Sequence, residues 1–143
     1  MPLNDLYQAR ILEHNRAPCN RFEMPDATHS ARGLDALCGD DLQLWLNVRD
    51  GVVERASWSG EACVITTASA SMLSDWVIGK RPAEIERGYR AFAGLLEDPE
   101  SDNDPQLGPF NALQPVGRFP SRKRNALLPW KTALDALNAG KQP

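Results

Sequence analysis

The spacing of apolar residues changes along the chain from a helical period to a strand period and back. Residues 3–14 carry apolar side chains three or four positions apart, which predicts a first helix that ends before Pro18. Residues 17–33 are polar and irregular, and they have room for one short strand. Apolar and polar residues then alternate over 42–48, which is the pattern of a half-buried strand.

A two-residue turn joins this strand to the next one. Asp50-Gly51 is a strong hairpin signal, and Val52 to Trp58 runs back as the partner strand. Together with the short strand expected before them, these segments indicate a small antiparallel sheet of about three strands.

Helical spacing returns after Cys63 in three segments. The first favours one apolar side and ends at Gly79, and the second opens at Pro82. The acidic, turn-rich residues 97–105 predict an exposed loop, and an apolar stripe over 127–137 predicts a last helix. The order of elements predicts an α+β fold of two layers, in which the small antiparallel sheet packs against helices.

The composition suits one domain over residues 1–143, with 42% hydrophobic and 24% charged residues. A net charge of −3 gives no pull toward nucleic acid or an anionic membrane surface, so neither is expected as a partner. No apolar run approaches the roughly 20 residues that span a bilayer. The N-terminal residues also lack the apolar segment of a signal peptide, and we therefore expect a cytoplasmic protein.

Three cysteines, at positions 19, 38 and 63, are the candidate chemistry. In a reducing compartment they indicate free thiols, metal ligands or catalytic groups rather than disulfides, although each can also be a small buried apolar residue. Cys38-Gly39-Asp40 stands immediately before the first clear strand, where Gly39 allows a tight turn and Asp40 offers a carboxylate near the sulfur. A thiolate and a carboxylate this close suit a tetrahedral zinc or iron site.

Cys63 stands at the junction of the second hairpin strand and a helix. Free backbone N–H groups and the helix dipole favour a thiolate there. The hairpin brings this junction and Cys38 to the same end of the sheet, so the spacing allows a shared site.

Several motifs resemble those of the IscU/NifU/SufU family of iron–sulfur cluster assembly scaffolds. Cys38-Gly39-Asp40 is similar to the family's first-cysteine motif, and Gly60-Glu61-Ala62-Cys63 is similar to its second. Phe119-Pro120-Ser121-Arg122 resembles the segment around its third cysteine. The long stretch before that segment is more like SufU than IscU, and the Leu-Pro-Pro-Val-Lys chaperone motif of IscU is absent.

The resemblance implies a function, a partner and residue roles. SufU-type proteins hold zinc through three cysteines and an aspartate, and their first cysteine accepts sulfur as a persulfide from a cysteine desulfurase. By position, Cys38 is then the sulfur acceptor. Cys38, Asp40 and Cys63 are the implied ligands for zinc, iron or an iron–sulfur cluster. The implied function is iron–sulfur cluster assembly with a SufS-like cysteine desulfurase, by a sulfur acceptor or scaffold rather than a turnover enzyme.

The chain departs from the family at its third cysteine, where Asn125 stands. An amide carbonyl is a poor ligand beside thiolates, so the site is one ligand short of closure. Pro129 acts on the same helical turn, because it cannot donate a hydrogen bond to the carbonyl of Asn125. Three interpretations stay open. Either His29 or Cys19 completes the site, or metal binds weakly or with a partner's ligand, or the chain is a degenerate module that only docks on and regulates a desulfurase. We favour the second, with emphasis on sulfur transfer.

Four basic residues precede the last helix, namely Arg118, Arg122, Lys123 and Arg124. This basic cluster is either a solvated surface or a docking site for an acidic patch on the desulfurase. We interpret Cys19 as an incidental thiol and His14 as a packing residue rather than a ligand.

Overall fold

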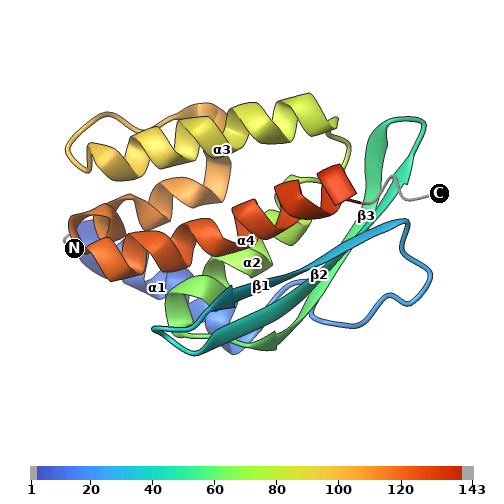
Figure 1. Cartoon of the computed structure of the whole chain (residues 1–143). Coiled ribbons are helices and arrows are strands. Elements are labelled where there is room, and N and C mark those ends of the chain that lie inside the picture. Colours follow the sequence, from blue (N-terminus) through green and yellow to red (C-terminus); the bar gives the residue numbers. More distant parts are fainter. Residues whose placement is uncertain (1–2, 140–143) are drawn as a thin grey trace.

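The computed structural model describes residues 3–139, with side chains from residue 9 onward (Figure 1). The predicted apolar positions before residue 9 therefore lie outside the described side chains. The strands are β1 (His29–Asp35), β2 (Asp40–Arg49) and β3 (Val52–Glu61). The helices are α1 (Leu3–Arg16), α2 (Val64–Trp76), α3 (Pro82–Glu97) and α4 (Pro120–Ala139), and the 3₁₀ helix is η1 (Pro105–Arg118). The α+β class and the three-stranded sheet are confirmed.

The sheet is an antiparallel meander in the order β1-β2-β3. Leu42, Leu44 and Leu46 of β2 are buried, whereas Gln43 and Trp45 between them are half-buried, so one face of the sheet packs on the core. The Asp50-Gly51 turn joins β2 to β3 as predicted, and both residues have positive φ angles, as a type I′ turn requires. The period-2 pattern and the Asp50-Gly51 turn signal together were sufficient to predict this hairpin.

α2 differs from the one-sided helix predicted from the sequence. Every residue from Ile65 to Ser74 is buried, because β3, α1, α4 and η1 all pack against this helix (Figure 1). Its hydroxyl groups bond inside the protein. Ser69 Oγ donates to the carbonyl of Ala126 at 2.6 Å, and Ser71 Oγ lies 2.7 Å from His14 Nδ1. The polar residues of α2 thus mark contacts with neighbouring elements rather than a solvent face.

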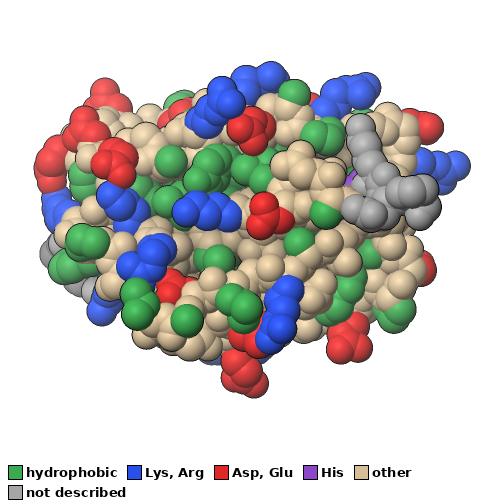
Figure 2. All heavy atoms as spheres, in the orientation of Figure 1, with side chains coloured by type: hydrophobic (Ala, Val, Ile, Leu, Met, Phe, Trp, Pro, Cys, Tyr) green, Lys and Arg blue, Asp and Glu red, His purple; other side chains and the backbone are tan. Residues whose placement is uncertain are grey.

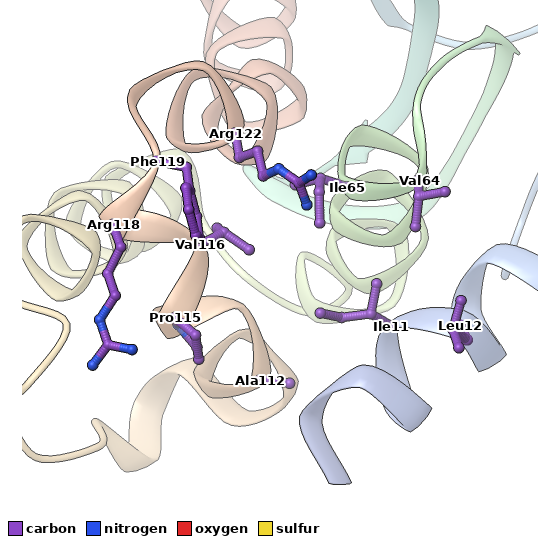
Figure 3. Close-up of a pocket in the computed structure, with 10 residues that line it drawn as sticks. All are labelled: Ile11, Leu12, Val64, Ile65, Ala112, Pro115, Val116, Arg118, Phe119 and Arg122. Atoms are coloured by element: carbon purple, nitrogen blue, oxygen red, sulfur yellow. The ribbon is translucent and has the colours of Figure 1, made fainter. Parts of the chain in front are cut away.

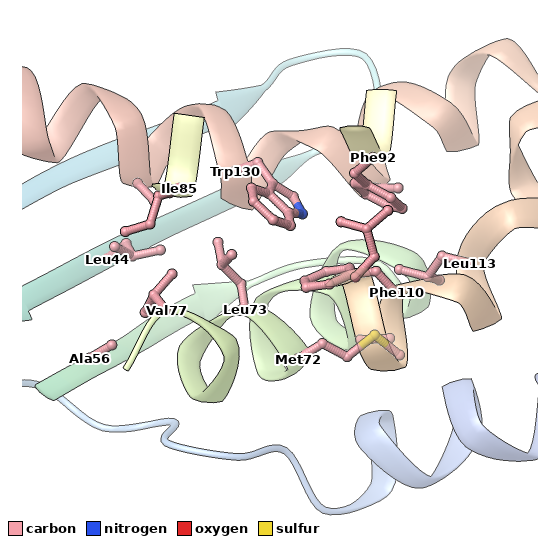
Figure 4. Packing of buried hydrophobic residues seen from close by; sticks show 14 of the residues in the cluster. Leu44, Ala56, Met72, Leu73, Val77, Ile85, Phe92, Phe110, Leu113 and Trp130 are labelled. Carbon is pink, nitrogen blue, oxygen red and sulfur yellow. The ribbon is translucent and has the colours of Figure 1, made fainter. Parts of the chain in front are cut away.

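The helices form more than one layer, which corrects the two-layer prediction. α4 lies along β1 and β2, whereas α3 packs on α4 and η1 (Figure 1). α4 can approach the sheet closely at Gly33 of β1, where a Cβ atom would overlap Thr132 Oγ1 of α4. Between these layers, the rings of Trp76, Phe92, Phe110 and Trp130 pack with centroids 4.8 to 6.4 Å apart. Figure 4 shows the last three of these rings.

η1 is an element that the sequence pattern did not predict. Pro109, Pro115 and a non-helical Gly108 interrupt it, yet Leu107 and Phe110 are fully buried. On the surface, charged side chains of both signs are spread over the face that Figure 2 shows, with apolar side chains between them. Within residues 3–139 no helix has the length and apolar character that crossing a membrane requires.

Candidate functional site

Cys38 lies exposed in the turn between β1 and β2. Asp35, the last residue of β1, holds this turn, because its Oδ1 accepts the backbone N–H groups of Leu37 at 3.1 Å and Cys38 at 3.3 Å. Gly39 has a φ of +75°, which favours glycine and lets the chain enter β2. Leu37 is 85% exposed beside the thiol. A partner protein can therefore reach Cys38 directly.

α4 fixes this turn through Arg124. The Nε of Arg124 donates to Asp35 Oδ2 at 3.0 Å, and its Nη2 lies 3.9 Å from Cys38 Sγ. Burial opposes the charge on Asp35, but the hydrogen bonds from Arg124 and from the amides of Cys38 and Leu37 outweigh it and hold the pKa of Asp35 below its ordinary value. A permanent positive charge thus stands beside the exposed thiol.

Asp40 and Cys63 meet where β2 begins and β3 ends. The antiparallel register brings these two ends together, and the Oδ1 of the buried Asp40 accepts the N–H of Cys63 at 2.8 Å. Cys63 Sγ lies 3.7 Å from Asp40 Oδ2. Cys63 is the N-cap of α2, as predicted, and its Sγ accepts the N–H of Thr66 at 3.5 Å.

The hydroxyl of Thr66 is the centre of this junction, although the sequence pattern did not single it out. Its Oγ1 lies 2.5 Å from Asp40 Oδ2 and 3.3 Å from Cys63 Sγ. It also lies 3.3 Å from the backbone carbonyl oxygen of Asn125 in α4. Because a hydroxyl has one proton, the shortest contact identifies Asp40 as its main acceptor. The position three residues after an N-cap, which faces back to the cap, is the signal that could have identified Thr66.

The predicted metal ligands are only partly brought together. Asp40 and Cys63 are adjacent, whereas the thiol of Cys38 faces Arg124. Among the residues that the structure describes, no three His, Cys, Asp or Glu side chains gather as a metal site requires. Asn125, at the position of the missing ligand, is 5% exposed, and its Oδ1 has no hydrogen-bond partner. This set of donors does not fit a closed four-ligand zinc or iron site.

Neither alternative ligand stands near the junction. His29 begins β1, at the opposite end from Asp35 and about 20 Å away along the strand. The backbone N–H of Cys19 donates to Ser71 Oγ at 2.8 Å, and Ser71 lies about 12 Å along α2 from Cys63. Burial raises the pKa of the Cys19 thiol. These positions agree with an incidental thiol at Cys19.

The basic cluster is largely neutralised by carboxylates. Arg118 pairs with Glu100, Lys123 pairs with Glu97 at 2.6 Å, and Arg124 pairs with Asp35 at 3.0 Å. In the described part of the chain, Arg122 is the member for which no carboxylate partner is found. Two of these pairs connect the acidic loop to the chain around the start of α4. The cluster is therefore not the surplus of positive charge that the sequence indicates.

An apolar groove of about 570 Å³ opens beside the Cys63 junction (Figure 3). Its walls come from α1, α2, η1 and the first turn of α4, and Val64 and Phe119 stand at 43% and 54% exposed. The guanidinium of Arg122 stacks on Phe119, 5.6 Å from the ring centroid, and points toward Ile65 across the groove (Figure 3). The groove thus combines apolar walls with one unpaired positive charge.

The comparisons with known proteins agree on one family. The model of the NifU-like N-terminal domain matches residues 6–124. The chain is 32% identical over 142 residues to the iron–sulfur cluster assembly scaffold protein IscU of Thermotoga maritima, covering 96% of each chain. It is 33% identical over 129 residues to the zinc-dependent sulfurtransferase SufU of Bacillus subtilis, covering 90% of this chain and 87% of the relative. The solved N-terminal NifU-like protein of Brucella abortus has the same fold, with a TM-score of 0.84 at 24% identity over 94% of each chain.

Proposed function

The chain belongs to the family of NifU-like N-terminal domains, and we propose that it works in iron–sulfur cluster assembly as a cytoplasmic acceptor of sulfur from a cysteine desulfurase. The observation that carries this proposal is Cys38, an exposed thiol in a turn that Asp35 and Arg124 hold in place. The two relatives described above, a scaffold and a sulfurtransferase by name, support the same role.

Sulfur transfer requires an accessible thiol on this chain and little else. The thiolate of Cys38 attacks the outer sulfur of the desulfurase persulfide, and a new S–S bond forms on Cys38. The S–S bond on the desulfurase breaks, and the desulfurase cysteine leaves as its thiolate. The transferred sulfur changes carrier without net oxidation or reduction, so the step needs no further reactant.

Arg124 has two functions in this proposal. It anchors the Cys38 turn through Asp35, and its Nη2 offers a positive charge 3.9 Å from Cys38 Sγ, where the anionic persulfide would form. The ligands predicted for zinc, iron or a cluster stay Cys38, Asp40 and Cys63, and no step of the transfer is assigned to a metal.

The apolar groove is the proposed contact surface for the desulfurase. Its apolar walls favour an apolar segment of the partner, and Arg122 favours a carboxylate next to that segment. The groove begins at Val64, directly after Cys63, so a protein seated there lies next to the Cys63 junction. One unpaired cation over an apolar surface replaces the basic cluster as the basis for docking.

Transfer to Cys38 is tested with the desulfurase of the same organism and its cysteine substrate. Wild-type chain should raise desulfurase turnover and carry a persulfide on Cys38, detected by mass spectrometry after alkylation. Cys38→Ser should abolish both signals, whereas the control Cys19→Ser should retain them. Unchanged stimulation by Cys38→Ser would exclude Cys38 as the acceptor.

Docking is tested separately by binding measurements. Arg122→Glu should weaken binding to the desulfurase at least tenfold, whereas Arg87→Glu, the same charge reversal on exposed α3, should leave it unchanged. Equal effects of the two variants would contradict a role for the groove.

A second function remains open because Asn125 stands at the third ligand position. A degenerate module would dock on the desulfurase and regulate it without accepting sulfur. Full binding and altered turnover, without a persulfide on Cys38, would favour this alternative.

A further inference from the structure

We infer that this chain holds its two site thiols in place without a metal ion. The hydroxyl of Thr66 links Asp40 to Cys63, and the guanidinium of Arg124 holds the Cys38 turn. The inference concerns how the site is built. It rests on the proposed function only where Cys38 is treated as the acceptor.

The buried carboxylate of Asp40 has hydrogen-bond donors from the protein itself. A buried negative charge needs partners, and in a metal site the metal supplies them. Here the N–H of Cys63 donates to Oδ1 at 2.8 Å, and the Thr66 hydroxyl donates to Oδ2 at 2.5 Å. Oδ2 is also the oxygen that faces Cys63 Sγ, at 3.7 Å. The oxygen that faces Cys63 Sγ thus has a donor in Thr66, so the charge of Asp40 does not depend on a metal ion for a partner.

Pro129 leaves one backbone carbonyl of α4 without its helical donor. It has no N–H group, so the carbonyl of Asn125 lacks its usual partner. The Oγ1 of Thr66 lies 3.3 Å from that carbonyl oxygen, while the proton of the hydroxyl goes mainly to Asp40. Thr66 therefore contacts α4 beside the position of the missing ligand, through the backbone of Asn125 rather than its side chain.

The guanidinium of Arg124 stands beside Cys38. Arg124 is a fixed cation, and a divalent metal bound by Cys38 Sγ would stand close to its guanidinium. This arrangement disfavours a metal ion at the thiol and favours an anionic sulfur species. The Nε of Arg124 donates to Asp35, while its Nη2 directs N–H groups toward the thiol.

The metal content and stability of the purified chain test the inference. Cells are grown with added zinc and iron, and the metals are measured by mass spectrometry. We expect far less than one metal ion per chain and an unfolding midpoint that a chelator does not change. One zinc or iron ion per chain, together with a midpoint that falls on chelation, would overturn the inference.

Two variants test the substitutes for the metal. Thr66→Val should lower the unfolding midpoint equally with and without added zinc, and restoration of the midpoint by zinc would count against a metal-free junction. Arg124→Gln should speed hydrogen exchange at the amides of residues 36–39, whereas the neighbouring control Arg122→Gln should not. Equal exchange in both variants would remove Arg124 from the proposal.

Persulfide formation in the presence of chelator separates the two proposals. Metal-free chain that accepts sulfur on Cys38 supports both. Metal-free chain that accepts none leaves this inference standing and defeats the proposed function. One metal ion per chain together with a persulfide on Cys38 defeats this inference and supports the proposed function.

Discussion

Thr66→Val measures how far the junction at Cys63 stabilises the fold. Valine keeps the shape of threonine but removes the hydroxyl, so Asp40 Oδ2 loses its donor at a buried site. Hydrogen bonds to charged groups contribute about 1.5–3 kcal/mol, and the unsatisfied carboxylate adds a desolvation cost, so we expect a loss of about 2–3 kcal/mol. Unfolding entropies of about 2.1 cal/mol/K per residue convert this loss to a midpoint lowered by about 7–10 °C.

The adjacent Thr67→Val is the matched control for this prediction. Thr67 is also buried in the first turn of α2, but its Oγ1 bonds the neutral backbone carbonyl of Ala62 at 3.3 Å. We expect it to cost about 1 kcal/mol or less. Urea unfolding at pH 7, followed by tryptophan fluorescence and circular dichroism, gives both free energies. If Thr66→Val costs no more than Thr67→Val, the hydroxyl–carboxylate bond does not stabilise the junction.

A double-mutant cycle isolates the pair itself. Asp40→Asn alone removes the charge that Thr66 bonds, and the double variant removes both partners. Direct contact predicts a coupling energy of about 1 kcal/mol or more between the two positions. Additive effects would place the cost of Thr66→Val in packing rather than in this bond.

Three further substitutions test the surrounding structure. Gly33→Ala should cost about 1–3 kcal/mol of unfolding free energy in urea, because its Cβ overlaps Thr132 Oγ1. Thr132→Ala in the same chain should recover most of that loss, and no recovery would mean that the strain lies in the strand itself. Asp35→Asn should destabilise the fold most at neutral pH. The lowered pKa of Asp35 stabilises the fold above about pH 4, and this stabilisation is lost as the pH falls further. An equal loss of unfolding free energy at pH 7 and pH 3 would contradict this prediction. Burial lowers the pKa of His14, so wild-type stability should fall as the pH drops below about 6.5. In the same unfolding assay, the stability of His14→Gln should depend less on pH in this range, and identical pH profiles of the two proteins would contradict the prediction.

Local patterns predicted the elements whose conformation depends on neighbours in the sequence. The alternation over β2 and the Asp50-Gly51 turn gave the hairpin, and Pro82 gave the start of α3. The helix α2 was predicted, but its burial on all sides was not, because serines and threonines of this helix bond residues far away in the sequence. η1 was missed because prolines and a non-helical glycine break its periodicity, while its burial comes from α3 and α4.

The candidate site likewise has a part that local sequence patterns predict and a part that they do not. The positions of Cys38, Asp40 and Cys63 at one end of the sheet follow from the hairpin register, so sequence reasoning could predict them. Thr66 stands three residues after the N-cap, which is a local signal, but its 3.3 Å contact with the backbone of Asn125 in another helix has none. Likewise, the basic cluster suggested a charged surface, because its carboxylate partners lie elsewhere in the chain.

The first turns of α4 connect the features on which the proposed function depends. Arg122 borders the groove, Arg124 holds the Cys38 turn, and the backbone carbonyl of Asn125 lies 3.3 Å from Thr66 Oγ1. These three residues lie in the first turns of one helix, and Phe119 of the groove directly precedes it, so a shift of that helix moves all of them together. A desulfurase segment that enters the groove would therefore press on the same helix that positions the acceptor thiol. In a closed metal site the ion would resist such movement, whereas hydrogen bonds and an ion pair can rearrange, so docking can adjust Cys38 without expelling a ligand.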